Sequence, residues 1–425
     1  MRTEDLIHFC APARLIMEKG ARARLPALIA HLGYTRGVLV TDTFFTTHTS
    51  WVREYVDAAR ALGVATHVFD GGAPDPTTTL CDEATRAVRD ALKGHAPDHV
   101  IALGGGSNID LAKALAVTLR DGTPVKHFVG ARGPLAALPL IAMPTTAGTG
   151  SEATPGAILV DPENATKVAV MDNALRPQIA LIDYELTMTC PPPVTADAGI
   201  DALTHAIESY LTIDSAAFDR ANHPDPGYSG RSSLTMLFAR ESIRLCARYL
   251  KRCYDDGSDE TARAAMCQAS FYAALSYGSA GLNAVHGIAY AVAGATHRSH
   301  GTTNAVMLPY AVGGLRQTRR AELLDIAADF GIDTAGDAGL AIDRLCLRLR
   351  ELIASVGIPV DLRALGIQEA ALDALTRDAL AVKRLAQAFP VTDVAAVYAD
   401  IVRRAFFGDL GKTPSVERDT ALDLH

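Results

Sequence analysis

The stretch HVIALGGGSNIDLAK, residues 99–113, decides the fold class of this 425-residue chain. Its first half is a continuous apolar run, which is typical of a strand covered on both faces in a parallel sheet. Three glycines follow, and a helical pattern then begins. Because glycines let backbone amides approach a phosphate at the positive end of a helix, Gly105, Gly106 and Ser107 are candidates for binding a dinucleotide pyrophosphate. The alternative is an ordinary tight turn with Ser107 as the helix cap, and the pattern is not GxGxxG.

Similar apolar runs recur on both sides of this stretch. They occupy residues 37–42, 66–72, 139–146, 157–161 and 179–184, and helical patterns lie between several of them. The N-terminal half is therefore expected to form an open, mostly parallel α/β sheet. Ligands bind such sheets at the carboxyl ends of the strands.

The proline run PPPV, residues 191–194, follows the last expected strand. Three prolines cannot continue a helix or a central strand, so we place a domain boundary there. We expect an α/β domain over residues 1–190 and an all-helical domain over residues 191–425. In the second half, long Ala/Leu/Arg-rich segments repeat apolar residues at spacings of three and four. The stretch 214–231, rich in Pro, Gly and Asx, is expected to be a loop-like insertion.

Composition limits the classes of partner. The chain has 40 basic and 48 acidic residues and a formal net charge of -8, which does not favour binding to nucleic acid or to an anionic membrane surface. No apolar run in the N-terminal region suits a signal peptide, and none that we identify reaches the roughly 20 residues of a membrane span. Seven cysteines without CxxC spacing fit a reducing cytoplasm. We therefore expect a cytoplasmic protein with small-molecule partners.

Two further polar clusters follow expected strands. The segment PTTAGTGSEAT, residues 144–154, offers hydroxyls and amides that suit a ribose, a phosphate or a carboxamide, although a polar turn is the plainer interpretation. Lys167 could reach the same ligand or be a solvated lysine. Asp42 closes the strand at 37–42, where a carboxylate accepts hydrogen bonds from an adenosine ribose and repels a 2'-phosphate. It therefore favours NAD over NADP, although an aspartate in this place is more often a turn former.

A metal site is indicated in the second half. In DALTHAIESY, residues 201–210, Asp201 and His205 are four residues apart and project from one face of a helix. His286 and His300 each precede a glycine further along the chain. Such pairs and single histidines are often structural, but one carboxylate with three imidazoles suits Fe(II) or Zn(II).

GGGSNIDLAK, PTTAGTGSE, DALTHAIE and the two HG pairs, in this order and spacing, resemble the iron-containing alcohol dehydrogenases over nearly the whole chain. The resemblance implies the fold shared with dehydroquinate synthase, an α/β dinucleotide-binding domain followed by an all-helical domain, and a homodimer. It also implies that Asp201, His205, His286 and His300 bind Fe2+, or alternatively Zn2+. The matching NAD positions are Asp42, Gly105, Gly106, Ser107, Asp110, Thr145, Thr146, Thr149, Thr154 and Lys167, with Ser151 in the same loop.

One position departs from the family pattern. Many members have a further histidine four residues after the first HG histidine, where this chain has Tyr290. Tyr290 is therefore the candidate to orient the substrate or relay its proton, with simple packing as the alternative. Tyr290 and the insertion at 214–231 are similar to the hydroxyacid-oxoacid transhydrogenase branch, which implies acids such as 4-hydroxybutyrate. Arg220, Arg231 and Arg298 are the candidate carboxylate anchors.

The expected function is that of a metal-dependent NAD(P) alcohol dehydrogenase, which interconverts an alcohol and an aldehyde or ketone by hydride transfer. The first alternative is a hydroxyacid-oxoacid transhydrogenase or a 4-hydroxybutyrate-type dehydrogenase. Maleylacetate reductase, which uses no metal, is disfavoured by the full Asp/His set. A lyase like dehydroquinate synthase would need basic residues around the metal, and none flanks Asp201 or His286.

Overall fold

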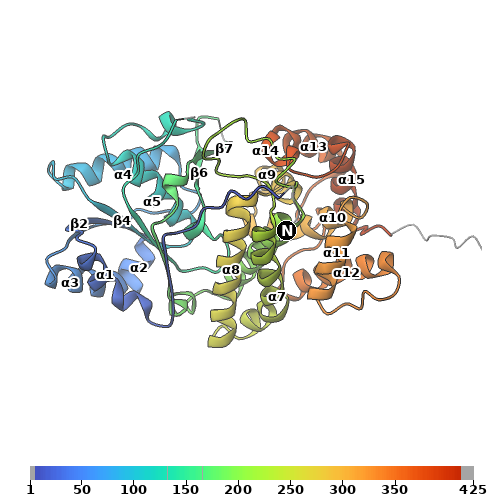
Figure 1. Ribbon diagram of the computed structural model, residues 1–425, viewed down its shortest axis with the longest axis horizontal. Coiled ribbons are helices and arrows are strands. Elements are labelled where there is room, and N and C mark those ends of the chain that lie inside the picture. Colours follow the sequence, from blue (N-terminus) through green and yellow to red (C-terminus); the bar gives the residue numbers. More distant parts are fainter. Residues whose placement is uncertain (1–4, 132, 165, 413–425) are drawn as a thin grey trace, which may run out of the picture. The chain divides into compact units, whose positions relative to one another are not determined.

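Six parallel strands, in the order β1-β8-β5-β4-β2-β3, form the main sheet of the computed structural model (Figure 1), which describes residues 5–131, 133–164 and 166–412. The strands are β1 (Arg14–Met17), β2 (Arg36–Val40), β3 (Ala65–Phe69), β4 (His99–Gly104), β5 (Leu140–Pro144) and β8 (Ile179–Ile182). The chain runs outward from β2 to β3 and then crosses back to β4 on the other side of β2. The carboxyl ends of β2 and β4 therefore flank the point where the strand order reverses, which is where α/β sheets bind ligands.

Helices cover both faces of this sheet, as expected from the apolar strands (Figure 1). They are α1 (Leu25–His31), α2 (Thr43–His48), α3 (Trp51–Ala61), α4 (Thr78–Ala91) and α5 (Gly106–Thr118). Alternate residues of β4 enter opposite cores. Val100 and Ala102 pack with α4 and α5, whereas Ile101 and Leu103 pack with α1 and α3. The expected parallel α/β domain is confirmed.

Two details of the sheet differ from expectation. The run 157–161 belongs to β6 (Gly156–Asp161), which pairs antiparallel with β7 (Thr166–Met171) in a separate two-stranded sheet. An alternating burial pattern along β6 matches this ribbon better than a central strand. The short strand β1 was not expected from the sequence. It lies at the edge of the sheet, pairs only with β8 and is half-exposed, so it has no long apolar run.

Three long helices follow the sheet: α6 (Pro192–Leu211), α7 (Ser233–Asp255) and α8 (Glu260–Ala280). The proline run starts α6 instead of only ending the strand region, since proline suits the first turn of a helix. The insertion at 214–231 contains no helix and is closed by a bridge between Asp214 and Arg231. By its internal packing the chain divides into the units Met1–Leu282 and Asn283–His425, so these three helices group with the sheet. The domain boundary near residue 190 stays a prediction.

The second unit is helical. Its helices are α9 (Ala284–Thr296), α10 (His300–Gly314), α11 (Arg320–Asp329), α12 (Ala338–Ser355), α13 (Leu372–Ala381), α14 (Lys383–Gln387) and α15 (Val394–Phe407). Helix α10 packs against α9, α12 and α15 and forms the centre of this unit. Within the described residues, no helix is both long enough and apolar enough to span a bilayer.

Candidate active site

The candidate cofactor residues of the first unit lie at the carboxyl ends of three neighbouring strands. Asp42 follows β2, the glycine turn follows β4, and the threonine loop at 144–154 follows β5. Asp42 caps α2 by accepting a hydrogen bond from Phe44 N at 2.9 Å, and its other oxygen accepts one from Asn108 Nδ2 at 2.7 Å. Because Asn108 lies in the first turn of α5, this bond fixes the carboxylate beside the glycine turn.

The glycine turn and the threonine loop are in direct contact. Gly105 is the N-cap of α5, and Thr145 N donates to Gly104 O at 3.0 Å. A Cβ on Gly106 would lie 2.6 Å from Thr149 Cγ2, so only glycine allows this approach. A Cβ on Gly105 would touch Thr146 at 3.5 Å. The structure thus brings together the two motifs that the sequence singled out separately.

Ser107 and Lys167 are linked through Asp75. Ser107 is not the cap of α5, contrary to one expectation, because the cap position falls on Gly105. Its Oγ instead accepts a hydrogen bond from Asp75 N at 3.3 Å, and Lys167 Nζ donates to Asp75 Oδ1 at 2.9 Å. Lys167 on β7 therefore lies near the glycine turn, although it forms an ion pair and is not simply solvated.

Lys113, which ends the motif GGGSNIDLAK, has a role that the sequence analysis missed. Its side chain is fully buried, and Nζ donates to Ser151 Oγ at 2.8 Å, Thr154 Oγ1 at 3.1 Å and Gly156 O at 2.8 Å. The Asp110 carboxylate lies 3.8 Å from this ammonium and accepts from Ser151 Oγ at 2.5 Å. Burial lowers the pKa of Lys113 to about 8, with Asp110 opposing the shift. These contacts hold the threonine loop, and a lysine within the apolar run LAKALAV of α5 was the available signal.

Glu152, in the same loop, is 2 % exposed. Burial raises its pKa to about 7, and the charge of Lys113 opposes that shift. Glu152 of the loop therefore lies among two buried ionisable groups of α5, Lys113 and Asp110, and burial raises the pKa of Asp110 as well. The sequence gives no separate sign of Glu152 beyond its place in the motif.

Helix α6 carries Asp201 and His205 on one buried face, as predicted from their spacing. They are 3 % and 4 % exposed, and Asp201 Oδ1 lies 3.7 Å from His205 Nε2. Tyr277 of α8 stacks on the His205 ring with centroids 4.1 Å apart. Its hydroxyl donates to Thr149 O. Tyr277 thus connects the threonine loop to the metal-ligand candidates, a connection with no sequence signal.

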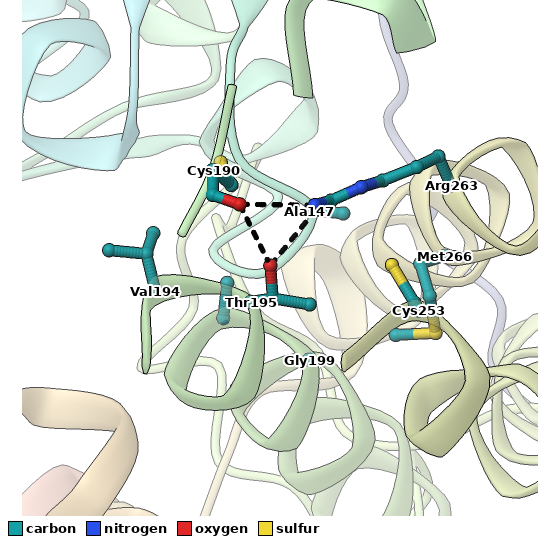
Figure 2. Close-up of a pocket in the computed structure, with 9 residues that line it drawn as sticks. Ala147, Cys190, Val194, Thr195, Gly199, Cys253, Arg263 and Met266 are labelled. Carbon is teal, nitrogen blue, oxygen red and sulfur yellow. Dashed lines mark hydrogen bonds between the residues drawn. The ribbon is translucent and has the colours of Figure 1, made fainter. Parts of the chain in front are cut away.

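The start of α6 is fixed by Arg263 of α8. Its Nη1 donates to Thr195 Oγ1 and its Nη2 to Cys190 O, both at 3.0 Å. Figure 2 shows this network beside Ala147 of the threonine loop, around a water-sized cavity of about 10 Å³. Arg263 therefore anchors the helix that presents Asp201 and His205.

The second unit holds the other candidates for metal binding. His286 of α9 and His300 at the start of α10 have ring centroids 5.1 Å apart. Asn304 Nδ2 lies 3.1 Å from His286 Nε2 and 3.2 Å from His300 Nε2, so both nitrogens face the same region. The ring of Tyr290 stacks on His300 at 5.6 Å and meets His286 edge-on at 6.3 Å. Tyr290 is thus in contact with the candidate ligands.

The candidate carboxylate anchors are engaged elsewhere or exposed. Arg220 donates to Ser215 O at 2.8 Å and to Ser229 O at 3.0 Å, and Arg231 pairs with Asp214 at 2.8 Å. Both arginines therefore stabilise the insertion itself. Arg231 also lines a pocket of about 820 Å³ in the first unit. Arg298 is exposed in the short segment between α9 and α10.

The sequence matches known families along most of its length. Residues 12–184 match the family "Iron-containing alcohol dehydrogenase", and residues 227–405 match "Fe-containing alcohol dehydrogenase family, C-terminal". Long-chain-alcohol dehydrogenase 1 of Geobacillus thermodenitrificans (strain NG80-2) is 34% identical over 92% of this chain and 94% of its own length.

Two further comparisons concern the substrate branch and the fold. The mitochondrial hydroxyacid-oxoacid transhydrogenase of Caenorhabditis briggsae is 29% identical, covering 85% of this chain and 82% of its own. A crystal structure of 1,3-propanediol oxidoreductase superposes with a TM-score of 0.83 and 28% identity, covering 94% of this chain and all of that one. The chain therefore belongs to the iron-containing alcohol dehydrogenase family.

Proposed function

We propose that this protein is a metal-dependent NAD alcohol dehydrogenase that interconverts a small neutral alcohol and its aldehyde or ketone. One observation supports it most: Tyr277 stacks on His205 and donates to the Thr149 carbonyl. A candidate metal ligand and the candidate nicotinamide loop are thereby joined through a single side chain. Hydride transfer needs this kind of fixed relation between the substrate oxygen and the cofactor.

The proposed cofactor site follows the three strand ends. Gly105, Gly106 and Ser107 bind the pyrophosphate at the start of α5, and Asp42 accepts hydrogen bonds from the adenosine ribose. The nicotinamide end is assigned to the threonine loop, through Thr145, Thr146, Thr149, Ser151 and Thr154, with Asp110 and Lys167 beside it. NAD supplies the hydride acceptor. The Asp42 charge supports NAD over NADP, because a 2'-phosphate would face a carboxylate.

We assign one divalent ion to Asp201, His205, His286 and His300. One carboxylate and three imidazoles suit Fe2+, with Zn2+ as the alternative. The 3.7 Å between Asp201 Oδ1 and His205 Nε2 is compatible with ligand bonds of about 2.0 to 2.2 Å to a shared ion. Such an ion supplies Lewis-acid chemistry at the substrate oxygen.

The residues of the chain provide orientation. Tyr277 fixes the His205 ring by stacking, and Arg263 fixes the helix that carries it. Tyr290 stacks on His300, and we assign it the orientation of the substrate or the transfer of its hydroxyl proton.

The substrate is proposed to be a neutral alcohol, because the arginines of the insertion are occupied by Asp214 and by backbone carbonyls. The second candidate is a hydroxy acid, as in the transhydrogenase branch, and the pocket lined by Arg231, Arg240 and Arg244 supports it. Comparing kcat/KM for 1-butanol and 4-hydroxybutyrate decides between them, since burying an unpaired carboxylate costs several kcal/mol. A strong preference for the acid that is lost in Arg231→Ala would reverse our choice.

Three further assignments complete the proposal. The scattered cysteines support a reducing cytoplasm, which fractionation tests. A homodimer follows from the family, and light scattering of the purified protein measures it. The all-helical catalytic domain from residue 191 is tested by limited proteolysis. First cleavage within the proline run supports this boundary, whereas first cleavage near residue 282, where the internal packing divides the chain, would contradict it.

The proposed function is tested with ligand variants. In His286→Ala and His300→Ala, the ion assigned to this site and turnover should be lost, because an open site misplaces the substrate oxygen. NAD binding, measured by calorimetry, should survive because the assigned NAD residues are untouched. Full metal content and activity in either variant would refute the ligand assignment.

A further inference from the structure

A second group of metal-ligand side chains lies outside the proposed active site. His8 and Cys10, near the N-terminus, meet Asp225 of the insertion at 214–231. His8 Nε2 is 3.0 Å from Asp225 Oδ1 and 3.8 Å from Cys10 Sγ, and all three ligand atoms lie within 4.8 Å of one another. A thiol, an imidazole and a carboxylate therefore converge at one point of the first unit.

Hydrogen bonds around this group hold it in place. Ser229 Oγ donates to His8 O at 3.1 Å, which ties the N-terminal segment to the end of the insertion. Asn173 Nδ2, at the start of the 3-10 helix η4 (Asn173–Leu175), donates to Asp225 Oδ1 at 2.7 Å and orients the carboxylate. Outer hydrogen bonds of this kind orient ligands at protein metal sites.

We propose that His8, Cys10 and Asp225 bind a Zn2+ ion that pins the N-terminal segment to the insertion. Tetrahedral zinc, with bonds of about 2.0 to 2.3 Å, places its ligand atoms roughly 3.3 to 3.8 Å apart. The separations of 3.0 and 3.8 Å from His8 Nε2 bracket this range closely. The third separation, between Cys10 Sγ and the Asp225 carboxylate, is within 4.8 Å, and a side-chain shift of about 1 Å or less brings it into the range. A mixed S, N and O set selects zinc over Mg2+ or Ca2+, which prefer oxygen ligands. Water fills the fourth position.

The thiol must lose its proton to bind the ion. Burial raises the pKa of Cys10, and the charge of Arg176 opposes that rise. Zinc binding displaces the proton from a thiol, so a neutral Cys10 in the metal-free protein is compatible with this site. The zinc site shares no residue with the four ligands assigned to catalysis, and the two assignments stand or fall separately.

Cobalt distinguishes the two sites in the full-length protein. After metal removal with a chelator and reduction of the thiols, Co2+ is titrated without oxygen and the near-ultraviolet spectrum is recorded. We expect a thiolate-to-cobalt charge-transfer band. Its intensity should stop rising when each chain has bound one Co2+ at the site of His8, Cys10 and Asp225. The Asp/His set contains no thiolate and cannot produce this band, whether or not it binds cobalt.

Three variants complete the test. Cys10→Ser should abolish the band, and Cys190→Ser, which alters another partly exposed cysteine, should keep it. Asp225→Asn keeps the size of the side chain and should weaken Co2+ binding about 10-fold or more. Losing a ligand should reduce the metal affinity at least as much as losing a residue that hydrogen-bonds to a ligand. Circular dichroism verifies folding of each variant. Absence of the band in the wild type, its survival in Cys10→Ser, or unchanged affinity in Asp225→Asn would overturn the proposal.

Discussion

Replacing Lys113 by methionine removes the ammonium that holds the threonine loop, and the contacts that are lost set the size of the fall in stability. Three acceptors lose their donor, and the Asp110 carboxylate 3.8 Å away loses its counter-charge. Breaking a buried ion pair from one side costs about 3 to 5 kcal/mol. For a chain of 425 residues that unfolds as one, this corresponds to a fall in Tm of roughly 3 to 6 °C.

The double variant Lys113→Met/Asp110→Asn isolates the charge. We expect it to be more stable than the sum of the two single variants predicts, because neither charge is then left alone. Urea unfolding followed by circular dichroism gives the four free energies. A loss below about 1 kcal/mol in Lys113→Met, or strict additivity in the cycle, would refute the reasoning.

The same lysine predicts a pH dependence. Its pKa is about 8 in the folded protein against an ordinary 10.5, so the unfolded chain binds more protons between these values. The contribution to stability is present above pH 10.5 and is lost as the pH falls through 8. As the pH rises from 8 to 10.5, the free energy of unfolding of the wild type should therefore increase relative to that of Lys113→Met by on the order of 3 kcal/mol.

Three further predictions concern the same site. Glu152→Gln should raise the free energy of unfolding at pH 8 relative to the wild type. A carboxyl with a folded pKa of about 7 stabilises the protein fully only below its unfolded pKa, and this stabilisation is lost as the pH rises through 7. Equal urea unfolding curves for the variant and the wild type at pH 8 would contradict this. Asp42→Ser, which keeps an N-cap acceptor for α2, should narrow the NAD preference in kcat/KM, and a native preference for NADP would overturn the assignment. Tyr277→Phe keeps the ring on His205 but leaves Thr149 O without its donor, so it should cost about 1 to 3 kcal/mol of stability and raise the KM for NAD. An unchanged KM would contradict the proposal that Tyr277 links His205 to the nicotinamide loop.

Local patterns predicted much of this arrangement. The strand-glycine-helix stretch at 99–113 identified β4 and α5, and the spacing of Asp201 and His205 placed both on one face of α6. Both are short-range features, set by the periods of strands and helices. The proline run was recognised as a break but not as the start of α6, because proline suits both roles.

Long-range contacts could not be predicted in this way. Tyr277 meets Thr149 across 128 positions of sequence, and Lys113 meets Ser151 across 38. Nothing in the segment around Tyr277 distinguishes it from a core tyrosine. The ribbon of β6 and β7 was likewise missed, since apolar content alone does not separate a parallel strand from an antiparallel one.

The proposed metal-dependent hydride transfer predicts that NAD reduction depends on added Fe2+. The protein is stripped with a chelator, and Fe2+ is added back stepwise without oxygen while NADH formation from 1-butanol is recorded. We expect activity to be absent in the stripped enzyme, to rise with added Fe2+ until the assigned Asp/His site is filled, and to stay absent in His205→Ala. Full NADH formation by the stripped protein, or recovery with Fe2+ in His205→Ala, would contradict a catalytic metal at the Asp/His site.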